Sequence, residues 1–122
     1  MAQRILIVED QSDNRQILRD LLTPAGYELV EAWDGNAAVV RAKADRPDLI
    51  LMDIQLPGID GYEATRQIRL DRSLDAVPII AVTSFAMGGD EERTQAAGCN
   101  AYVAKPFSPR QLLKKIRELL PP

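Results

Sequence analysis

Histidine is absent from this chain of 122 residues. Its absence excludes catalytic triads that use an imidazole, metal sites with histidine ligands, and a phosphohistidine on this chain. Cysteine occurs once, at Cys99, so neither an internal disulfide nor a cysteine-based zinc site can form.

Long apolar runs and a strong charge of either sign are also missing. No apolar run approaches the roughly 20 residues that a membrane span requires, and the start MAQRILIVED turns acidic before a signal-peptide core could form. The formal net charge of -3 argues against binding to a phosphate backbone, which needs clustered Lys and Arg. We therefore expect a cytoplasmic protein without a nucleic-acid partner and without membrane insertion.

The length suits one globular domain, which we place over residues 1–122. Only Pro121 and Pro122 follow the last expected helix, so we expect no attached output domain. Output would then depend on non-covalent contacts with other proteins.

Short runs rich in Ile, Leu and Val alternate with helix-length segments along the chain. The expected strands are 4–9, 27–32, 48–53, 78–83 and 101–105, and the expected helices are 12–25, 34–45, 60–70, 87–97 and 108–120. Asp34 and Ser108 are expected N-caps, and Gly26 and Gly98 stand where C-terminal glycines belong. The alternation predicts an α/β fold: a (βα)5 three-layer sandwich of the flavodoxin-like type, with a five-stranded parallel sheet in the order 2-1-3-4-5.

Acidic residues end two of the expected strands. Glu9 and Asp10 end the first strand, and Asp53 ends the third, which neighbours the first in this strand order. At about 5 Å and an effective dielectric near 20, each pair of unit negative charges repels by roughly 3 kcal/mol. A cation relieves that repulsion, and oxygen-only ligands in an open site suit Mg²⁺. We therefore predict one weakly held Mg²⁺ at this edge.

A hydroxyl and an ammonium group close two further strands at the same edge. Thr83 ends the fourth expected strand and Lys105 ends the fifth. A carboxylate nucleophile, a divalent cation, a hydroxyl and a fixed ammonium together fit phosphoryl transfer, in which positioning and charge neutralisation do most of the catalytic work. The expected product is an aspartyl phosphate on Asp53.

Four segments carry a resemblance to a known family: ILIVEDQSDNR, DLILMDIQLPGIDGYE, PIIAVTSFA and AGCNAYVAKPF. Together they resemble the receiver domain of two-component response regulators, of the single-domain kind found among chemotaxis regulators. The resemblance implies that Asp53 accepts a phosphoryl group from the phosphohistidine of a histidine kinase or a histidine phosphotransfer protein. It also implies that Asp10 and Asp53 bind Mg²⁺ with the backbone carbonyl of Gln55, while Glu9 acts through a metal-bound water.

The same resemblance assigns the remaining site residues. Thr83 and Lys105 would hold the phosphoryl oxygens, and Tyr102 would change rotamer on phosphorylation. The Lys105–Pro106 peptide bond would be cis. The chain would be a phosphoacceptor in signalling or in a phosphorelay, not an enzyme, with only its own phosphorylation and autodephosphorylation as chemistry.

The segment 87–97 links this chemistry to a surface. It is poor in large apolar residues, and Gly88 and Gly89 each cost about 1 kcal/mol against alanine inside a helix. We expect it to be the least anchored helix. On phosphorylation, the face made by the fourth helix, the fifth strand and the fifth helix would then change shape for a downstream protein.

Three other interpretations compete with the receiver. An Asp-nucleophile phosphohydrolase of the haloacid dehalogenase type needs a second Asp two positions after the first, where this chain has Gln55. A nucleotide or flavin module needs a phosphate-binding loop after the first strand, but the loop EDQSDN would repel phosphate. A phosphate-independent interaction module would lack a site residue, and none is missing.

Three positions depart from the commoner receiver pattern: Glu9 in place of a first Asp, Gln55 two residues after the phosphoacceptor, and Phe85 two residues after Thr83. The latter two flank the route of the attacking water and bear on the lifetime of the phosphate. For Tyr102, an ordinary half-buried strand tyrosine without a switching role is the alternative.

Overall fold

The structure is a computed structural model that describes residues 2–84 and 90–121. Within these residues, strands and helices alternate from the first strand to the last helix. The strands are β1 (Arg4–Val8), β2 (Glu28–Ala32), β3 (Leu49–Asp53), β4 (Ile79–Thr83) and β5 (Ala101–Ala104). The helices are α1 (Ser12–Leu22), α2 (Gly35–Asp45), α3 (Gly61–Arg69), α4 (Asp90–Ala97) and α5 (Pro109–Leu119), with a short 3₁₀ helix η1 (Arg72–Leu74) between α3 and β4.

The strands form one parallel sheet in the order β2-β1-β3-β4-β5, which confirms the predicted topology. β3 lies at the centre, and each of its five residues is buried. In the register of this sheet, Val8 at the end of β1 faces Met52, and Asp53 at the end of β3 faces Val82. The carboxyl ends of β1, β3 and β4 therefore meet at one edge.

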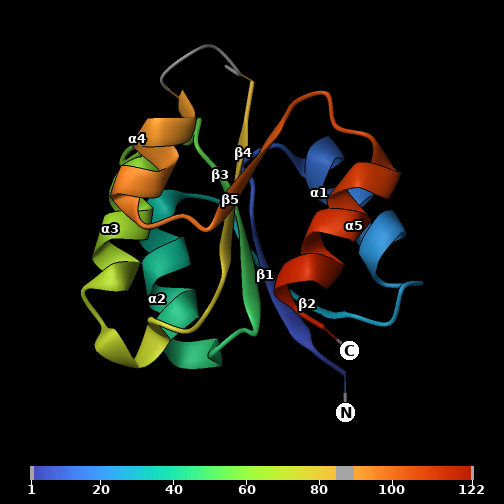
Figure 1. Ribbon diagram of the computed structural model, residues 1–122, viewed down its shortest axis with the longest axis horizontal. Helices are drawn as coiled ribbons and strands as arrows, with labels where there is room; N and C mark the ends of the chain where they lie inside the picture. The colour runs from blue at the N-terminus through green and yellow to red at the C-terminus, as the bar shows by residue number, and fades with distance from the viewer. Residues whose placement is uncertain (1, 85–89, 122) are drawn as a thin grey trace.

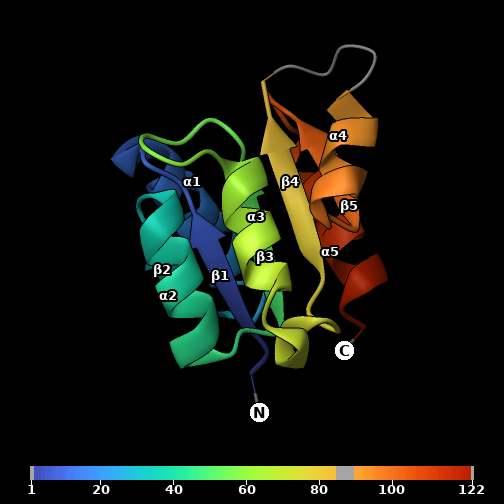
Figure 2. The same cartoon turned by 90° about the vertical axis from the view of Figure 1, so that its left-hand side faces the viewer.

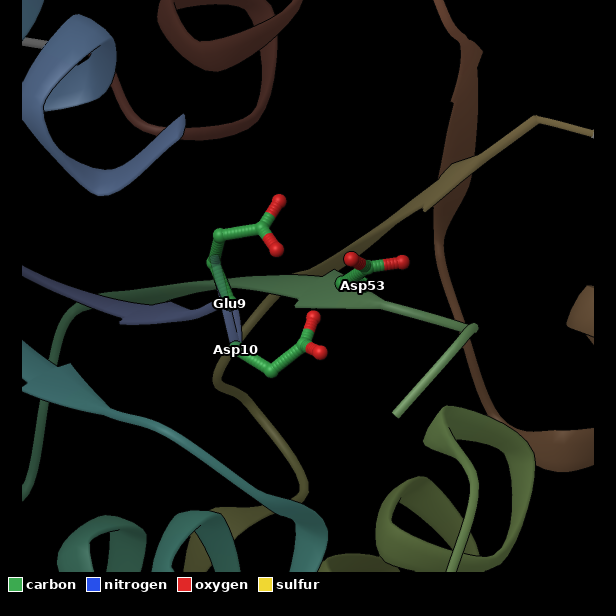
Figure 3. A group of neighbouring side chains, drawn as sticks. All are labelled: Glu9, Asp10 and Asp53. Carbon is green, nitrogen blue, oxygen red and sulfur yellow. The ribbon is translucent and has the colours of Figure 1, made fainter. Parts of the chain in front are cut away.

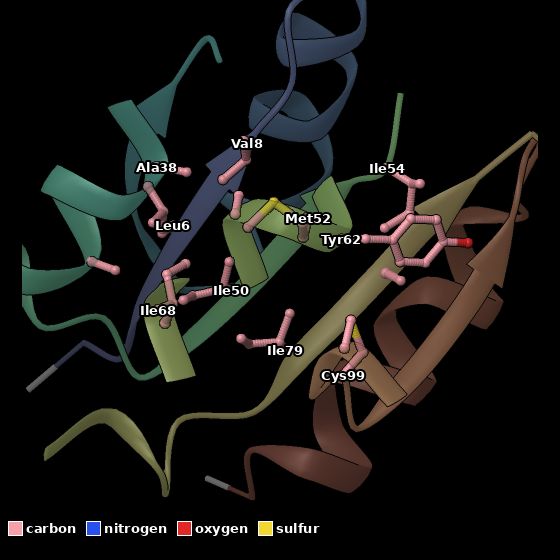
Figure 4. Packing of buried hydrophobic residues seen from close by; sticks show 14 of the residues in the cluster. Leu6, Val8, Ala38, Ile50, Met52, Ile54, Tyr62, Ile68, Ile79 and Cys99 are labelled. Atoms are coloured by element: carbon pink, nitrogen blue, oxygen red, sulfur yellow. The ribbon is translucent and has the colours of Figure 1, made fainter. Parts of the chain in front are cut away.

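Helices cover both faces of the sheet (Figures 1 and 2). α2, α3 and α4 lie on one face, and α1 and α5 lie on the other. Alternate residues of each central strand point to opposite faces, so Leu6 and Ile50 join the cluster under α2 and α3 (Figure 4), while Ile7 and Leu51 join the cluster under α1 and α5. Two apolar layers hold the sheet rigidly between them, and this fixes where the strand ends point.

Helix caps match the sequence at several positions. Asp34 accepts the backbone N–H of Ala37 at 2.7 Å, and Ser108 accepts that of Gln111 at 3.5 Å, with Pro109 in the first turn of α5. Gly98 directly follows α4 and has positive φ, as expected of a glycine that terminates a helix. Gly26 also has positive φ, but it lies in the turn beyond α1, whose C-cap is Thr23, so it does not terminate that helix as predicted.

One helix is shorter than predicted. α1 ends at Leu22 rather than at residue 25, because Pro24 has no N–H to continue the helical hydrogen bonds. For α4, the described part Asp90–Ala97 ends where predicted, and the predicted positions 87–89, with Gly88 and Gly89, lie outside the described residues.

The edge opposite the acidic strand ends brings the two ends of the described chain together (Figure 1). The side-chain amide of Gln3 donates to the carbonyl oxygen of Pro121 at 3.0 Å. None of the helices in residues 2–84 and 90–121 is both long and apolar enough to span a membrane.

Candidate functional site

Three carboxylates converge at the carboxyl edge of the sheet (Figure 3). Glu9 and Asp10 directly follow β1, and Asp53 is the last residue of the neighbouring β3. One carboxylate oxygen from each of the three lies within 4.8 Å of the others. Glu9 and Asp53 are each only 3% exposed, and Asp10 is half-buried. The convergence predicted from the strand order is therefore present.

Lys105 bridges two of these carboxylates. Its Nζ lies 3.0 Å from Oδ2 of Asp53 and 3.2 Å from Oε1 of Glu9. Burial favours the neutral amine, but the hydrogen bond to Asp53 and its charge, together with the charge and hydrogen bond of Glu9, outweigh burial and raise the pKa of Lys105. The ammonium form is therefore held firmly between the two acids.

Backbone amides hold the remaining oxygens of the same two carboxylates. The N–H of Gln55 donates to Oδ1 of Asp53 at 2.9 Å, and the N–H of Gln11 donates to Oε2 of Glu9 at 3.1 Å. Each buried carboxylate thus has one contact with Lys105 and one with the main chain, which fixes its orientation. For Gln55 the structure gives this N–H contact, and the role of its carbonyl stays a prediction.

Thr83 is buried at the end of β4, and its carbonyl oxygen accepts the N–H of Lys105 at 2.7 Å. In the register of β4 and β5, Thr83 faces Ala104 and Ala81 faces Tyr102. Ala81 and Tyr102 both belong to the apolar layer under α2, α3 and α4. Because side chains two residues apart share a face, Thr83 and Tyr102 point to the same side of the sheet.

The Lys105–Pro106 peptide bond is cis, as the family resemblance implies. Phe85, which the sequence placed beside the route of attacking water, lies outside the described residues.

A cleft of about 370 Å³ opens beside the acidic cluster. Glu9, Asp53 and Lys105 belong to its lining, and most of its other lining residues are apolar. Ile17 and Leu18 of α1 and the segment Pro106–Phe107 are among them. The Asp53 carboxylate therefore borders a cleft large enough for a small phosphorylated group, and the order of the strand ends does not predict this cleft.

The donor set fits a magnesium ion. Mg²⁺ binds oxygen at about 2.1 Å, so ligands on opposite sides of the ion are about 4.2 Å apart, and the three carboxylates already lie within 4.8 Å of one another. In formal charge, three carboxylates and one ammonium leave two negative charges, which a divalent cation balances. Glu9, Asp10 and Asp53 therefore suit Mg²⁺ in both chemistry and spacing.

One residue that touches this region was not expected from the sequence. Arg15 is nearly buried in α1, and its Nη1 donates to the backbone carbonyl oxygen of Glu9 at 2.9 Å. A signal was present, because Arg15, Leu18 and Leu22 share the buried stripe of α1. An arginine on an otherwise apolar stripe needs buried partners, which sequence alone does not identify.

Comparison with known proteins gives a consistent result. The sequence profile of the response regulator receiver domain matches residues 5–117. The polar-differentiation response regulator DivK of Brucella anthropi is 45% identical over 120 residues, which cover 98% of both chains.

Solved structures agree with the sequence match. The receiver domain of a sensor histidine kinase from Pseudomonas aeruginosa, with a magnesium ion coordinated in its active site cleft, superposes with a TM-score of 0.90 at 42% identity and covers 98% of both chains. The response regulator TrrA of Thermotoga maritima, in complex with Mg²⁺ and BeF, has a TM-score of 0.86 at 30% identity, with coverage of 97% of this chain and 99% of that one.

Proposed function

Because this chain belongs to the response regulator receiver domain family, whose function is to accept a phosphoryl group in two-component signalling, we propose that Asp53 is its phosphoacceptor. The observation that carries the proposal is the position of Asp53: a buried carboxylate close to two other acids and an ammonium, in the lining of a cleft. The donor would be the phosphohistidine of a histidine kinase or of a histidine phosphotransfer protein.

Asp53 is oriented for attack. One oxygen accepts the N–H of Gln55 and the other contacts Lys105, but each carboxylate oxygen has two lone pairs. A lone pair therefore remains for the bond to phosphorus, which forms as the bond from phosphorus to the imidazole nitrogen of the donor breaks. The two contacts hold the nucleophile still, so most of the entropy cost of orientation is met before the donor arrives.

Glu9, Asp10 and Asp53 would hold Mg²⁺, with Glu9 acting through water and with the Gln55 carbonyl as a further ligand. The bound ion supplies charge neutralisation for the incoming phosphoryl group, whose negative oxygens the three carboxylates would otherwise repel. The spacing of the three carboxylates and the magnesium ion in the cleft of the Pseudomonas aeruginosa receiver support this assignment.

Lys105 and Thr83 would hold the phosphoryl oxygens. The Lys105 ammonium already touches the attacking carboxylate, so a small movement of its side chain brings it to a phosphoryl oxygen on Asp53. Thr83 ends the strand next to Asp53, and its hydroxyl would donate a further hydrogen bond. Movement of Thr83 toward the phosphate would make space on the face that Tyr102 shares, so Tyr102 is the proposed switch.

The signal would leave through the face formed by α4, β5 and α5. α4 packs against α3 and β5, and the described part of α4 follows the Thr83 loop in the chain. A downstream protein would bind this face, or the phosphoryl group would pass on to a histidine phosphotransfer protein. We also propose a cytoplasmic location, because the kinase domain and the receiver must meet in one compartment. The domain would carry out no chemistry beyond its own phosphorylation and autodephosphorylation.

The test is phosphorylation by acetyl phosphate with Mg²⁺, followed by intact mass. We expect a labile adduct of one phosphoryl group in the wild type and no adduct in Asp53→Asn. An adduct that persists in Asp53→Asn would place the phosphate elsewhere and overturn the proposal. Stoichiometric uptake without turnover separates a receiver from a phosphohydrolase, and the complete lack of an adduct would favour a phosphate-independent interaction module.

Metal binding is tested separately by thermal unfolding. A ligand present at 100 times its Kd stabilises a protein by about 2.7 kcal/mol, so Mg²⁺ should raise the Tm of the wild type measurably. Asp10→Asn removes one ligand charge but leaves the Lys105 contacts intact, and its Tm should respond much less. An equal response in both proteins would exclude Asp10 as a ligand. Amide exchange in residues 84–97 on addition of beryllofluoride tests the switch, and unchanged exchange there would contradict it.

A further inference from the structure

Arg15 is a nearly buried cation that the phosphoryl chemistry does not use. Its side chain is 11% exposed, and the guanidinium lies 4.7 Å from the centre of the Trp33 ring, the single tryptophan of the chain. Its Nε lies 3.3 Å from Oε1 of Glu31, and the same oxygen also binds Nη1 of Arg19 at 2.6 Å. The positive charge of Arg15 is thus paired with Glu31 of β2 and not with the carboxylates of the acidic cluster.

The remaining contact of Arg15 reaches the acidic edge. Nη1 donates to the backbone carbonyl oxygen of Glu9 at 2.9 Å. That carbonyl belongs to the peptide unit that joins Glu9 to Asp10. On the other side of Glu9, its N–H donates to the carbonyl oxygen of Ala32 at 3.1 Å. The main chain at Glu9 is therefore held from both sides, by β2 and by Arg15.

Fixing this peptide unit fixes two carboxylates. Its orientation sets ψ of Glu9 and φ of Asp10, and hence the directions in which both side chains leave the backbone. Glu9 reaches Lys105 and the N–H of Gln11, and Asp10 reaches the metal-ligand cluster. The peptide unit between Glu9 and Asp10 cannot rotate without breaking the Arg15 hydrogen bond.

We propose that Arg15 is a positioning residue for the magnesium site: through the Glu9 carbonyl it sets the orientation of the Glu9 and Asp10 carboxylates, while Glu31 and Trp33 hold its guanidinium in place. This inference rests on the proposed metal-binding function of the acidic cluster. Residues that orient metal ligands without binding the metal typically change affinity 10- to 100-fold when they are replaced.

Charge and geometry predict opposite effects, which makes the proposal testable. If Arg15 acted only through its positive charge, it would oppose a cation, and its removal would tighten Mg²⁺ binding. If it acts by positioning, Arg15→Lys should weaken binding although the charge is kept, because an ammonium lacks the planar fork that spans the Glu9 carbonyl, Glu31 and Trp33 together.

The experiment is isothermal titration of the full chain with Mg²⁺, well below the Tm of each variant. Arg15→Lys and Arg15→Met should both weaken Mg²⁺ binding about tenfold or more. Arg19→Met is the matched control, because it removes another partner of Glu31 while the described contacts of Arg19 are with Glu31 and Gln16 rather than with Glu9, and its Kd should stay within about twofold of wild type. An unchanged Kd in Arg15→Lys, or tighter binding in Arg15→Met, would overturn the proposal.

A second measurement separates this proposal from the metal site itself. The N–H of Gln11 donates to Glu9, so its exchange rate in metal-free protein reports whether the Glu9 carboxylate keeps its orientation. We expect faster exchange of this amide in Arg15→Lys and unchanged exchange in Arg19→Met. If the wild-type protein takes up no Mg²⁺, the proposed metal function is refuted, but the positioning role of Arg15 is still tested by the Gln11 amide. Unaltered exchange of that amide in Arg15→Lys would refute the positioning role.

Discussion

Lys105 Nζ lies 3.0 Å from Oδ2 of Asp53, although the two residues are 52 positions apart in the chain. The contact exists because β4 separates the strands that carry them and all three end at the same edge. It places a positive charge against the proposed nucleophile. A Mg²⁺ ion bound to Asp53 would therefore share that carboxylate with Lys105.

Replacing Lys105 with methionine should tighten Mg²⁺ binding while slowing phosphorylation. The substitution removes a competing cation from Asp53 and Glu9, and a gain of about 1.4 kcal/mol corresponds to a tenfold lower Kd. Phosphoryl uptake from acetyl phosphate should fall, because the ammonium no longer neutralises the incoming oxygens. Titration calorimetry and intact mass measure the two effects. Lys43→Met, on the exposed side of α2, should change neither, and weaker Mg²⁺ binding in Lys105→Met would contradict the prediction.

The stability supplied by Lys105 should disappear only at high pH. Its pKa is raised in the folded protein, so the folded state binds the proton more tightly than the unfolded state does. The contribution is complete below the ordinary lysine pKa of about 10.4 and is lost as pH rises through the raised value. The difference in unfolding free energy between wild type and Lys105→Met, measured by denaturant titration, should be constant from neutral pH to about pH 10 and then shrink. A difference that grows above that pH would show that the sign is wrong.

Gly61→Ala should damage both the fold and the site. A Cβ at Gly61 would clash with the carbonyl oxygen of Asp53 and would lie 2.6 Å from Cα of Ile54, and neither backbone atom can rotate away. Overpacking of this kind costs about 1–3 kcal/mol or more. Denaturant unfolding should give this loss, and phosphorylation of Asp53 should slow because its peptide unit has to shift.

Gly58→Ala is the control for that substitution. Gly58 has φ of 75°, so alanine there costs about 1–2 kcal/mol through backbone strain, but nothing lies within 4 Å of the added Cβ. The two variants should therefore lose comparable stability, with slower phosphorylation in Gly61→Ala alone. Equal phosphorylation rates at equal folded fraction would refute the proposed coupling to Asp53.

Cys99 should react slowly with thiol reagents in the native protein. Burial raises the pKa of its thiol by more than the hydrogen bond with Thr65 and the charge of Arg69 lower it, so little thiolate forms near neutral pH. Labelling with a disulfide reagent should be slow in buffer and fast in guanidinium chloride. Native labelling as fast as that of free cysteine would contradict the prediction.

Arg69→Met extends the same measurement. Arg69 donates to the carbonyl oxygens of Gly98 and Leu74 and to the side chain of Asn100, and so ties α3 to the turn before β5. Its loss raises the pKa of the thiol further, because the positive charge is gone, but it also loosens that turn, and we expect the gain in exposure to dominate and to speed labelling of Cys99. Arg66→Met loses an exposed ion pair with Glu63 and should label at the wild-type rate.

The sheet and most of the site could be read from the sequence for a simple reason. In a parallel α/β fold the residue after each apolar run lies at one edge, so the order of the strands brings Glu9, Asp10 and Asp53 together without any knowledge of side-chain conformation. The same logic reaches Thr83 and Lys105, because each closes its strand.

The features that the sequence did not predict depend on side-chain conformations and on the exact ends of helices. From the sequence, Lys105 was expected to bind phosphoryl oxygens. Its contacts with Asp53 and Glu9 depend on the side-chain rotamer, which the structure shows and the sequence does not. The role of Arg15 was not predicted, because its partners lie on β2 and on a main-chain carbonyl, and no sequence pattern identifies such partners. The end of α1 at Leu22 could have been predicted from the sequence, because Pro24 cannot donate the next helical hydrogen bond. The prediction extended the helix to residue 25 on its helical periodicity instead.

The contact between Gln3 and Pro121 puts both ends of the described chain on the side of the sheet away from Asp53. A biosensor chip, a fluorophore or an affinity handle joined at either end would consequently leave the cleft beside Asp53 facing outward. Immobilised in that way, the protein could be probed by kinases and small phosphodonors in solution without obstruction from its own anchor.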